Sequence, residues 1–376
     1  MKIARVIKNL DYLLLGAVGL ILVMGLFVLD SATVNASVKY NMSFVYRQMA
    51  WIVVGLIVFI VVLFVDYSKL SKYGVHIYVL NLLLLLAVLI FGEETNGAQA
   101  WIPIGPYKIQ PAEIVKALLI LGLAQFLAPR IGKLNTFKDL IPVFIYVGVP
   151  LLLILKQPDL GTGLVYVAIM FGMLLVAGAS PLLLFSLIGG GIGIIVLAIY
   201  GHYAWDWWIP LKDYQLMRLV VFVDPMIDPH YTGWNVIQSQ IAVGSGGLLG
   251  KGWGMGSQNI NDFLPVQWTD FIFCVLAEEF GFIGSAILLL LFFVVIYRGI
   301  IIARKSKDTY GSLIAVGVVS MIIFHVLQNI GMTIGIMPIT GIPLPFVSYG
   351  GSSLLANMMV LGLLMNVYIY HDQRIF

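Results

Sequence analysis

Residues 270–297 of the chain read DFIFCVLAEEFGFIGSAILLLLFFVVIY. The charged side chains in this stretch are Asp270, Glu278 and Glu279, and the 18 residues that follow them carry no charge. A helix that crosses the hydrocarbon core of a bilayer needs about 20 mostly apolar residues. The stretch therefore predicts a membrane-spanning helix that begins near Asp270, at one surface of the membrane.

The whole chain has the same apolar character. Of its 376 residues, 61% are hydrophobic and 10% are charged, whereas a soluble domain carries about 25% charged residues. This composition excludes a soluble globule, whose core stops growing well below this length, and a disordered chain. An outer-membrane barrel would show short alternating strands in place of long apolar runs. The remaining class is an all-α, polytopic integral membrane protein.

Ten apolar runs are candidate transmembrane helices, and we expect the fifth, sixth and seventh to be the shortest. No soluble segment is large enough to stand apart, so residues 1–376 are predicted to form a single transmembrane domain. A large extracytoplasmic loop at about 201–269 separates the seventh and eighth runs. The ten runs are Asp11–Leu29, Met49–Phe64, Gly74–Phe91, Pro111–Ala128, Leu140–Leu155, Gly163–Gly178, Pro181–Tyr200, Asp270–Tyr297, Tyr310–Ile336 and Ser352–Tyr370.

Lysine and arginine in the loops predict the orientation of the chain. If the N-terminus is cytoplasmic, 13 of the 21 basic residues lie inside, seven lie outside and Lys116 falls within a span. Cytoplasmic loops carry an excess of these residues, so both termini are expected in the cytoplasm. The net charge of +3 without a basic stripe predicts no nucleic-acid partner. The lone Cys274 excludes a disulfide framework.

Two ionisable residues fall inside the fourth run. Pro111 suits the first position of a helix, which places Glu113 and Lys116 three residues apart on one helix face. Ionisable side chains within a span are costly unless they pair or face a polar cavity. Two interpretations stay open: an ion pair that fixes helix packing, and a pair that lines a substrate cavity, with Lys116 facing an anion.

Polar clusters on the outer side offer further candidates. Asp159, in the segment KQPDLGTG at 156–163, is favoured as a helix cap. Residues 244–256 read GSGGLLGKGWGMG, and their glycines fit a mobile re-entrant loop, a flap, or a nest of amides for a phosphate. This loop is not a Walker A motif, because Gly252 follows Lys251 in place of Ser or Thr.

Asp270 and the start of the last helix each allow two interpretations. Asp270 is either a helix cap or a partly desolvated carboxylate suited to general base work. On one continuous helix, Glu278 and Glu279 would point about 80° and about 180° away from Asp270, so no paired-carboxylate site is expected. Ser348 and Ser352 could bind an anion at the positive end of the last helix, although capping is the safer interpretation.

Four long motifs occur along the chain: WIPIGPYKIQPAEIVK at 101–116, KQPDLGTG at 156–163, FLPVQWTDFIFCVLAEEFGFIG at 263–284 and NIGMTIGIMPITGIPLPFVSYGGSS at 329–353. Through these motifs the sequence resembles the SEDS family of shape, elongation, division and sporulation proteins, over nearly its whole length. The tetrads LAEE at 276–279 and MTIG at 332–335 are more like the elongation branch than the division branch. A sporulation paralogue stays open.

The resemblance implies an activity and a set of site residues. SEDS proteins are peptidoglycan glycosyltransferases that polymerise lipid II, together with a class B penicillin-binding protein that crosslinks the strands and with other membrane proteins of the elongation complex. The essential carboxylate of the family falls on Asp270, its outer-loop tryptophan on Trp101, and the Glu and Lys of its Gln-Pro-x-Glu motif on Glu113 and Lys116. Many relatives carry His-Thr-Asp where this chain has Trp268-Thr269-Asp270, so no role for that histidine is carried over.

The expected reaction joins two lipid-linked sugars at the outer face of the bacterial cytoplasmic membrane. Asp270 would accept the proton of the acceptor hydroxyl, whose oxygen attacks the anomeric carbon of the donor as isoprenoid diphosphate leaves. A divalent cation, Mg²⁺ or Mn²⁺, is one candidate for neutralising that diphosphate. The substrate-binding candidates are Trp101, Glu113, Lys116, Arg218, Lys251, Ser348 and Ser352.

Two functions of other classes would use the same features. A lipid-linked precursor flippase would need the cavity and the intramembrane charges but no base. A non-catalytic scaffold would need only to recruit a transpeptidase. Composition and topology do not separate these three functions, and the family motifs favour the glycosyltransferase.

Overall fold

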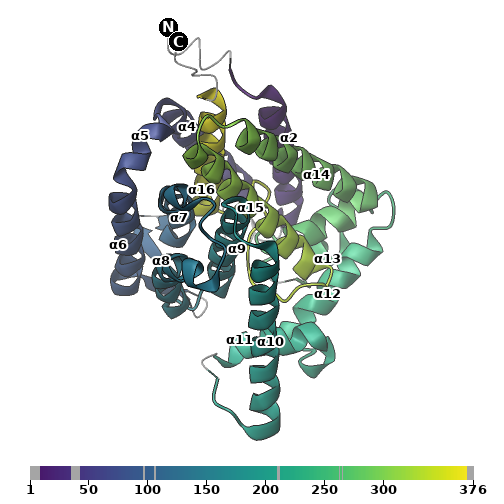
Figure 1. Ribbon diagram of the computed structural model, residues 1–376. Coiled ribbons are helices and arrows are strands. Elements are labelled where there is room, and N and C mark those ends of the chain that lie inside the picture. The colour runs from purple at the N-terminus through teal and green to yellow at the C-terminus, as the bar shows by residue number, and fades with distance from the viewer. Residues whose placement is uncertain are drawn as a thin grey trace.

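The computed structural model describes residues 9–34, 43–95, 98–105, 107–209, 212–261, 263–264 and 266–370. These residues form a bundle of long helices, with several short helices at its lower end in Figure 1. The start of the first long helix and the end of the last lie together at the other end, where the amide of Asp11 donates to the sulfur of Met365. The first eight and last six residues, which the orientation prediction also uses, lie outside the described residues.

Long helices occupy all ten predicted runs. Among the described residues, nine helices are long and apolar enough to cross a membrane, with α7 counted together with the 3₁₀ turn that extends it to Arg130. The apolar helix α9 is shorter, with 17 residues. At 1.5 Å per residue α9 spans about 25 Å, slightly less than the hydrocarbon core. The predicted class, an α-helical multi-pass membrane protein, is confirmed. The long helices are α2 (Tyr12–Ala32), α4 (Phe44–Phe64), α6 (Gly74–Phe91), α7 (Pro111–Leu127), α8 (Phe137–Lys156), α9 (Leu160–Val176), α10 (Pro181–Trp205), α14 (Ile272–Lys305), α15 (Thr309–Thr333) and α16 (Gly351–Ile369).

Burial divides these helices into a centre and a periphery. Helices α7, α15 and α16 form the centre, and 78% of the apolar window of α16 is buried. Only 6% of the corresponding window of α10 is buried, and α10 projects from the bundle in Figure 1. The prediction that the seventh run is among the shortest is wrong, because α10 has 25 residues and continues past Tyr200 until Asp206 adopts a left-handed conformation with φ 56°.

The segments on the predicted outer side, between the long helices, contain regular structure. Their high content of glycine and proline obscured short elements that are apolar on one face, as in α11, which buries Leu216 and Val221. A three-stranded antiparallel sheet consists of β1 (Glu93–Thr95), β2 (Ala98–Ile104) and β3 (Tyr107–Ile109). The large loop contains α11 (Asp213–Val223), α12 (Thr232–Ser245) and α13 (Ser257–Ile260), and α5 (Tyr67–Leu70) precedes α6.

Helix α14 is broken at Gly281, whose backbone has φ 65° and ψ −160°. A break in a membrane helix frees backbone groups, which need partners because the bilayer core offers no water. The glycine-rich loop 246–252 supplies these partners, so this loop is fixed to α14 through its main chain. The amides of Lys251 and Gly252 donate to the carbonyls of Glu278 and Glu279, and the amides of Phe282 and Ile283 donate to the carbonyls of Gly247 and Leu248, all at 2.9–3.1 Å.

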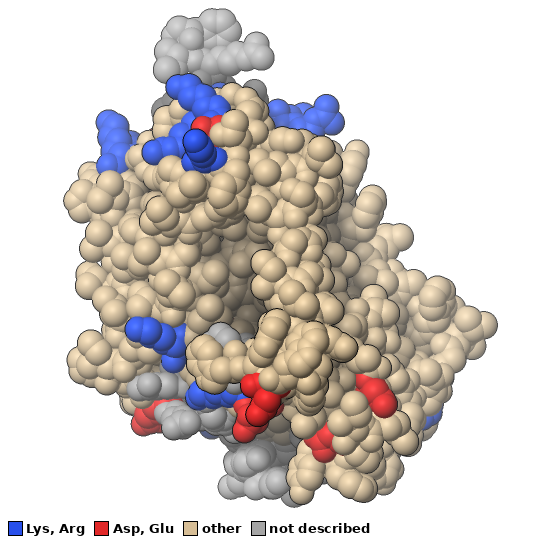
Figure 2. Space-filling view, turned by 60° about the horizontal axis from the view of Figure 1, so that its bottom comes forward, with Lys and Arg blue, Asp and Glu red and all other residues tan. Residues whose placement is uncertain are grey.

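Charged side chains separate along the bundle (Figure 2). Lysine and arginine gather at the upper edge of this view, acidic residues lie with further basic ones near the lower edge, and a broad belt between them shows none. Such a belt is what a bilayer requires, because charged side chains are costly in its core. The orientation of the two ends in the membrane stays a prediction.

Candidate active site

A cavity of about 490 Å³ lies at the start of α16, the opposite end of that helix from the contact between Met365 and Asp11 at the start of α2. Its walls come from the first turns of α4, α7 and α16, from β2 and β3, and from the segments before α14 and α16. Its size is typical of a ligand site. The lining residues are Arg47, Trp51, Trp101, Lys108, Gln110, Glu113, Val266, Trp268, Thr269, Asp270, Gly341, Pro343, Tyr349, Gly350, Gly351, Ser352 and Ser353.

Asp270 lies on the wall of this cavity and does not cap α14. The N-cap of α14 is Phe271, and no side chain in the described part of the chain caps that helix end. The carbonyl of Asp270 accepts a hydrogen bond of 2.8 Å from the Asn329 side chain, which fixes its backbone to α15. Its carboxylate lies against Gly341, where a Cβ would come within 3.2 Å of Oδ2. Asp270 is therefore held from both sides while its carboxylate faces the cavity.

The surroundings of Asp270 change its acidity. The side chain is half-buried, and this burial raises the pKa of Asp270 above its ordinary value of 3.8. The hydroxyl of Thr269 and the positive charge of Arg218 lower the pKa and so moderate the rise. Because of the raised pKa, the ionised carboxylate is a stronger base than that of an ordinary surface aspartate.

Glu113 and Lys116 form the predicted pair on one face of α7. Lys116 Nζ lies 2.8 Å from Glu113 Oε1, and both side chains are almost fully buried. Lys116 faces a chamber of about 50 Å³ that shares Gln110, Glu113, Gly341 and Pro343 with the larger cavity. The second oxygen of Glu113, Oε2, has no hydrogen-bond partner among the described residues. Glu113 thus lines both the large cavity and the small chamber, whereas Lys116 lines only the small chamber.

His325 of α15 also contacts this pair, and sequence reasoning missed it. Its Nε2 atom lies 3.3 Å from Lys116 Nζ, and its Nδ1 atom lies 3.2 Å from the carbonyl oxygen of Pro343. The side chain is fully buried. The rule that drew attention to Glu113 and Lys116, an ionisable group within an apolar span, applies equally to His325.

The predicted serines hold segments of the site together. The hydroxyl of Ser348 donates to the carbonyl of Thr269 at 2.6 Å and accepts from the amide of Leu344 at 2.8 Å. The hydroxyl of Ser352 accepts from the amide of Gln110 at 2.9 Å, so it does not cap α16, which has no side-chain cap. Ser352 lines the cavity, whereas Ser348 is buried behind it.

Trp101 and Arg218 lie at different distances from the cavity. Trp101, in β2, is half-buried and lines it. Arg218, on α11, is not among the lining residues, and its guanidinium carbon lies 5.7 Å from the centre of the Tyr214 ring. Its charge is nevertheless close enough to lower the pKa of Asp270.

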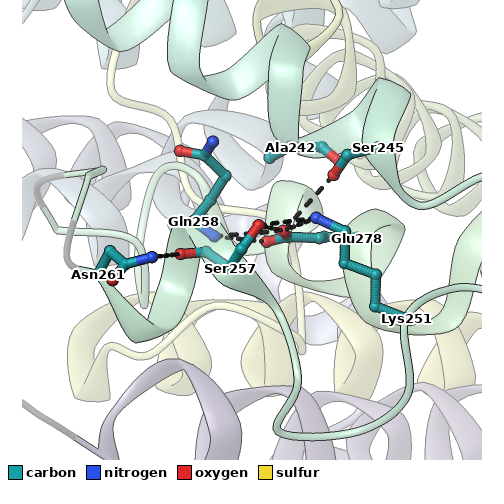
Figure 3. A network of polar contacts seen from close by, with 7 residues as sticks. All are labelled: Ala242, Ser245, Lys251, Ser257, Gln258, Asn261 and Glu278. Atoms are coloured by element: carbon teal, nitrogen blue, oxygen red, sulfur yellow. Dashed lines mark hydrogen bonds and ion pairs between the residues drawn. The ribbon is translucent and has the colours of Figure 1, made fainter.

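Lys251 lies in a separate polar network around the buried Glu278 (Figure 3). Lys251 Nζ is 2.6 Å from Glu278 Oε1 and donates to the Ser257 hydroxyl at 2.7 Å. The Ser257 hydroxyl and the amide of Gln258 also donate to the Glu278 carboxylate, at 2.9 and 3.2 Å. These contacts tie the loop after α12 to α14, and the structure does not bring Lys251 to the Asp270 cavity.

Asp159 caps α9, as predicted. Its Oδ1 atom accepts from the amide of Thr162 at 2.9 Å, and Oδ2 accepts from the Thr162 hydroxyl at 2.8 Å and from the Gln110 side chain at 3.3 Å. Asp159 lines the small chamber with Lys116. Its carboxylate therefore has three donors of its own.

The described part of the chain contains no group of three or more His, Cys, Asp or Glu side chains that could hold a metal ion. Asp270 alone does not form a protein cage for Mg²⁺ or Mn²⁺, and a cation beside it would take most of its ligands from water or substrate. Sequence reasoning also left out Arg47, which lines the cavity near the start of α4. The signal in the sequence is a basic residue, Arg47, at the start of a predicted span.

Comparisons with known proteins agree with each other. The family model of the FtsW, RodA and SpoVE cell cycle proteins matches residues 11–373. Stage V sporulation protein E of Bacillus subtilis is 40% identical over 96% of this chain and 97% of its own. Peptidoglycan glycosyltransferase MrdB of Escherichia coli K12 is 35% identical over 93% and 92%. A chain from a structure of a peptidoglycan synthase complex that coordinates polymerization and crosslinking aligns with a TM-score of 0.79 and 32% identity, over 97% of this chain and 99% of that one.

Proposed function

The chain belongs to the FtsW/RodA/SpoVE family of cell cycle proteins, and on that premise we propose that Asp270 is the general base with which it polymerises lipid II. The chain is a peptidoglycan glycosyltransferase, the activity for which its relative MrdB is named. The observation that carries the proposal is the half-buried carboxylate of Asp270, with its raised pKa, on the wall of the large cavity. A base of this kind is suited to removing a proton from a hydroxyl group.

In the proposed step, ionised Asp270 takes the proton of the 4-hydroxyl of the acceptor sugar. The hydroxyl oxygen forms a bond to the anomeric carbon of the donor, and the bond from that carbon to the diphosphate breaks. The diphosphate leaves with the electron pair, and the single displacement turns an α linkage into a β-1,4 linkage. One carboxylate is sufficient because a diphosphate can leave without an added proton when positive groups stabilise it.

Several positive groups near the cavity support this account of the leaving group. Arg47 and Lys108 line the cavity, and Lys108 also pairs with Glu93 at 2.8 Å. Gly351 and Ser352 begin α16, whose first amides have no side-chain cap and carry the positive end of the helix dipole. We assign the diphosphate to this wall. A divalent cation at the diphosphate stays a prediction, to be addressed by repeating the polymerisation assay with and without a chelator.

The proposed setting is the cytoplasmic membrane of a bacterium, with the Asp270 cavity at the outer face. Lipid II would keep its isoprenoid chain in the bilayer while its sugars enter the cavity. The proposed partner is a class B penicillin-binding protein that crosslinks the strands, within a complex of other elongation proteins. The likeness to a chain of a synthase complex supports this assignment.

Purified protein and lipid II in detergent provide the test. We expect wild-type protein to yield glycan strands and Asp270→Asn, which keeps the shape but cannot accept a proton, to lose at least about 100-fold in rate. Thermal stability in detergent should be unchanged for the variant. Wild-type-like polymerisation by Asp270→Asn would remove this residue from the mechanism.

The same assay separates the two other functions. A flippase yields no glycan in detergent, because no bilayer is there to cross. A scaffold yields no glycan under any condition, and its Asp270→Asn variant still assembles with a transpeptidase. Glycan product from the wild type excludes both as the whole function.

A further inference from the structure

The side chain of His325 is enclosed between two partners that have opposite hydrogen-bonding roles. Its Nε2 atom faces the ammonium of Lys116 at 3.3 Å, and its Nδ1 atom faces the carbonyl of Pro343 at 3.2 Å. The His325 side chain has no exposed surface, and Lys116 is 1% exposed. The contact therefore joins α7, α15 and the segment before α16 in the interior of the bundle.

These partners determine the state of the imidazole ring. A carbonyl oxygen can only accept, so Nδ1 must carry a hydrogen. An ammonium can only donate, so Nε2 must present its lone pair. The geometry thus requires the neutral ring with its proton on Nδ1.

Lys116 is in turn the partner of the carboxylate that reaches the large cavity. Its Nζ atom holds Glu113 Oε1 at 2.8 Å. Glu113 Oε2 is buried and has no hydrogen-bond partner among the described residues, and Glu113 lines the Asp270 cavity. An ammonium held on one side only could swing, and Glu113 would move with it. The contact from His325 removes that freedom.

We propose that His325 is a positioning residue, which fixes the Lys116 ammonium and so keeps the unpaired, buried Oε2 of Glu113 at the cavity wall, where a hydroxyl or amide group of an entering substrate donates to it. The proposal deepens the proposed function and rests on it. His325 does not touch the reacting atoms, and its effect passes through Lys116 and Glu113. Its loss should weaken substrate binding more than it slows the chemical step.

Two substitutions at His325 separate its two contacts. The amide of His325→Gln can reach the place of Nε2 and accept from Lys116, whereas the shorter amide of His325→Asn lies near the place of Nδ1 and keeps the contact with Pro343. We expect His325→Asn to raise the KM for lipid II about tenfold, with kcat within about threefold of wild type. We expect His325→Gln, which keeps the contact with Lys116, to have a KM within about threefold of the wild-type value.

A purely structural role predicts a different pattern. If His325 served only to anchor the segment before α16, His325→Asn would retain activity and His325→Gln would lose it. If the substitutions only reduced the folded fraction, apparent kcat would fall with KM unchanged. Either result overturns the proposal. The matched control is His202→Asn, because His202 Nδ1 also lies near a backbone carbonyl, that of Trp207 at 2.8 Å, but this residue is only partly buried and lies on α10, away from Lys116.

A spectroscopic measurement tests the contact without reference to activity. In protein labelled with ¹⁵N-histidine, the signals that disappear in His325→Gln belong to His325. We expect them to report a neutral ring protonated on Nδ1. A ring protonated on Nε2, or on both nitrogens, would overturn the contact itself. If the wild type failed to polymerise lipid II but gave the expected signals, the proposed function would fail while the geometry of the contact stood.

Discussion

At the residue scale, the backbone and the side chain of Asp270 are controlled by different neighbours. Asn329 donates to the carbonyl of Asp270 and to that of Ile342, both at 2.8 Å. Gly341 leaves space beside the carboxylate, and its φ of 75° favours glycine. One asparagine thus aligns the two segments that meet at the carboxylate, and the missing side chain of one glycine lets them approach.

The raised pKa of Asp270 predicts a pH dependence. A general base works in its ionised form, so activity falls as pH falls through the pKa of Asp270. Because burial raises that pKa, we expect the acid limb of kcat/KM to have its midpoint above 3.8. Removing the positive charge of Arg218, as in Arg218→Gln, should move the midpoint higher still, since that charge lowers the pKa. Rates of lipid II polymerisation across the acid pH range would measure the midpoint for the wild type and for Arg218→Gln. A lower midpoint in Arg218→Gln would contradict the assignment of Asp270 as the titrating base.

Sequence patterns predicted these residues to different degrees. The spacing of Glu113 and Lys116 was sufficient to predict their pairing, because it depends only on helix geometry within one element. The contact with His325 could not be predicted, because its partner is more than two hundred residues away and depends on how α7 packs against α15. Asp270 was found through its motif, whereas its shielding from water depends on Gly341 and the cavity wall.

At the scale of elements, the loop 246–252 and the broken helix α14 form one unit. A Cβ on Gly250 would lie 2.1 Å from the carbonyl oxygen of Glu279, and one on Gly246 would lie 2.0 Å from that of Ala277. The glycines are needed for close approach of two main chains, in addition to the positive φ of 81° at Gly250. Single-sequence reasoning could find the glycines but not their purpose, because the contacting backbone lies about thirty residues further along the chain.

A matched pair of substitutions measures this docking. Gly250→Ala should destabilise the protein by about 1–3 kcal/mol beyond the cost of a left-handed alanine, because its Cβ overlaps the Glu279 carbonyl. Gly254→Ala is the control, since Gly254 also has a positive φ, 72°, but no atom of the described residues lies within 4 Å of its Cβ position. Thermal unfolding in detergent compares the two variants. Equal midpoints would show that close approach at Gly250 contributes nothing.

The structure of the short outer elements could be predicted least well. The sheet of β1–β3 consists of strands of three to seven residues, which are too short for a periodic pattern to stand out. The long spans were located correctly because a bilayer imposes length and composition on them regardless of tertiary packing. The predicted start of α14 is about two residues too early, because Asp270 lies on the cavity wall outside the helix and Phe271 occupies the cap position.

At the scale of the whole molecule, both ends of the described chain lie on one side of the bundle, and most of the candidate site lies on the other. An even number of spans produces this arrangement. It allows substrate chemistry at one surface while the chain enters and leaves at the other. Once the side of the membrane on which one loop lies is known, the orientation of the whole bundle follows. The prediction is that the candidate site lies outside the cell.

Cysteine labelling tests that orientation. The native Cys274 is fully buried and should not react. Asn135 and Asp213 are both exposed. Asn135 follows the end of α7, whose first turn lines the cavity, whereas Asp213 begins α11, whose Tyr214 hydroxyl donates to the carbonyl of Pro158 near the start of α9. In spheroplasts, a membrane-impermeant maleimide should label Asp213→Cys and spare Asn135→Cys, and in inside-out vesicles the pattern should reverse. Labelling of Asn135→Cys in spheroplasts would mean that the site faces the cytoplasm.

Helix α10 is the transmembrane helix whose surface depends most on the surrounding lipid. Because only 6% of its apolar window is buried by protein, its remaining surface gains nothing from packing against the bundle, and acyl chains must cover it. A helix packed this weakly can adjust its tilt to the thickness of the surrounding bilayer at small cost. We therefore expect the composition of the membrane to influence α11, the next helix along the chain, which carries Arg218.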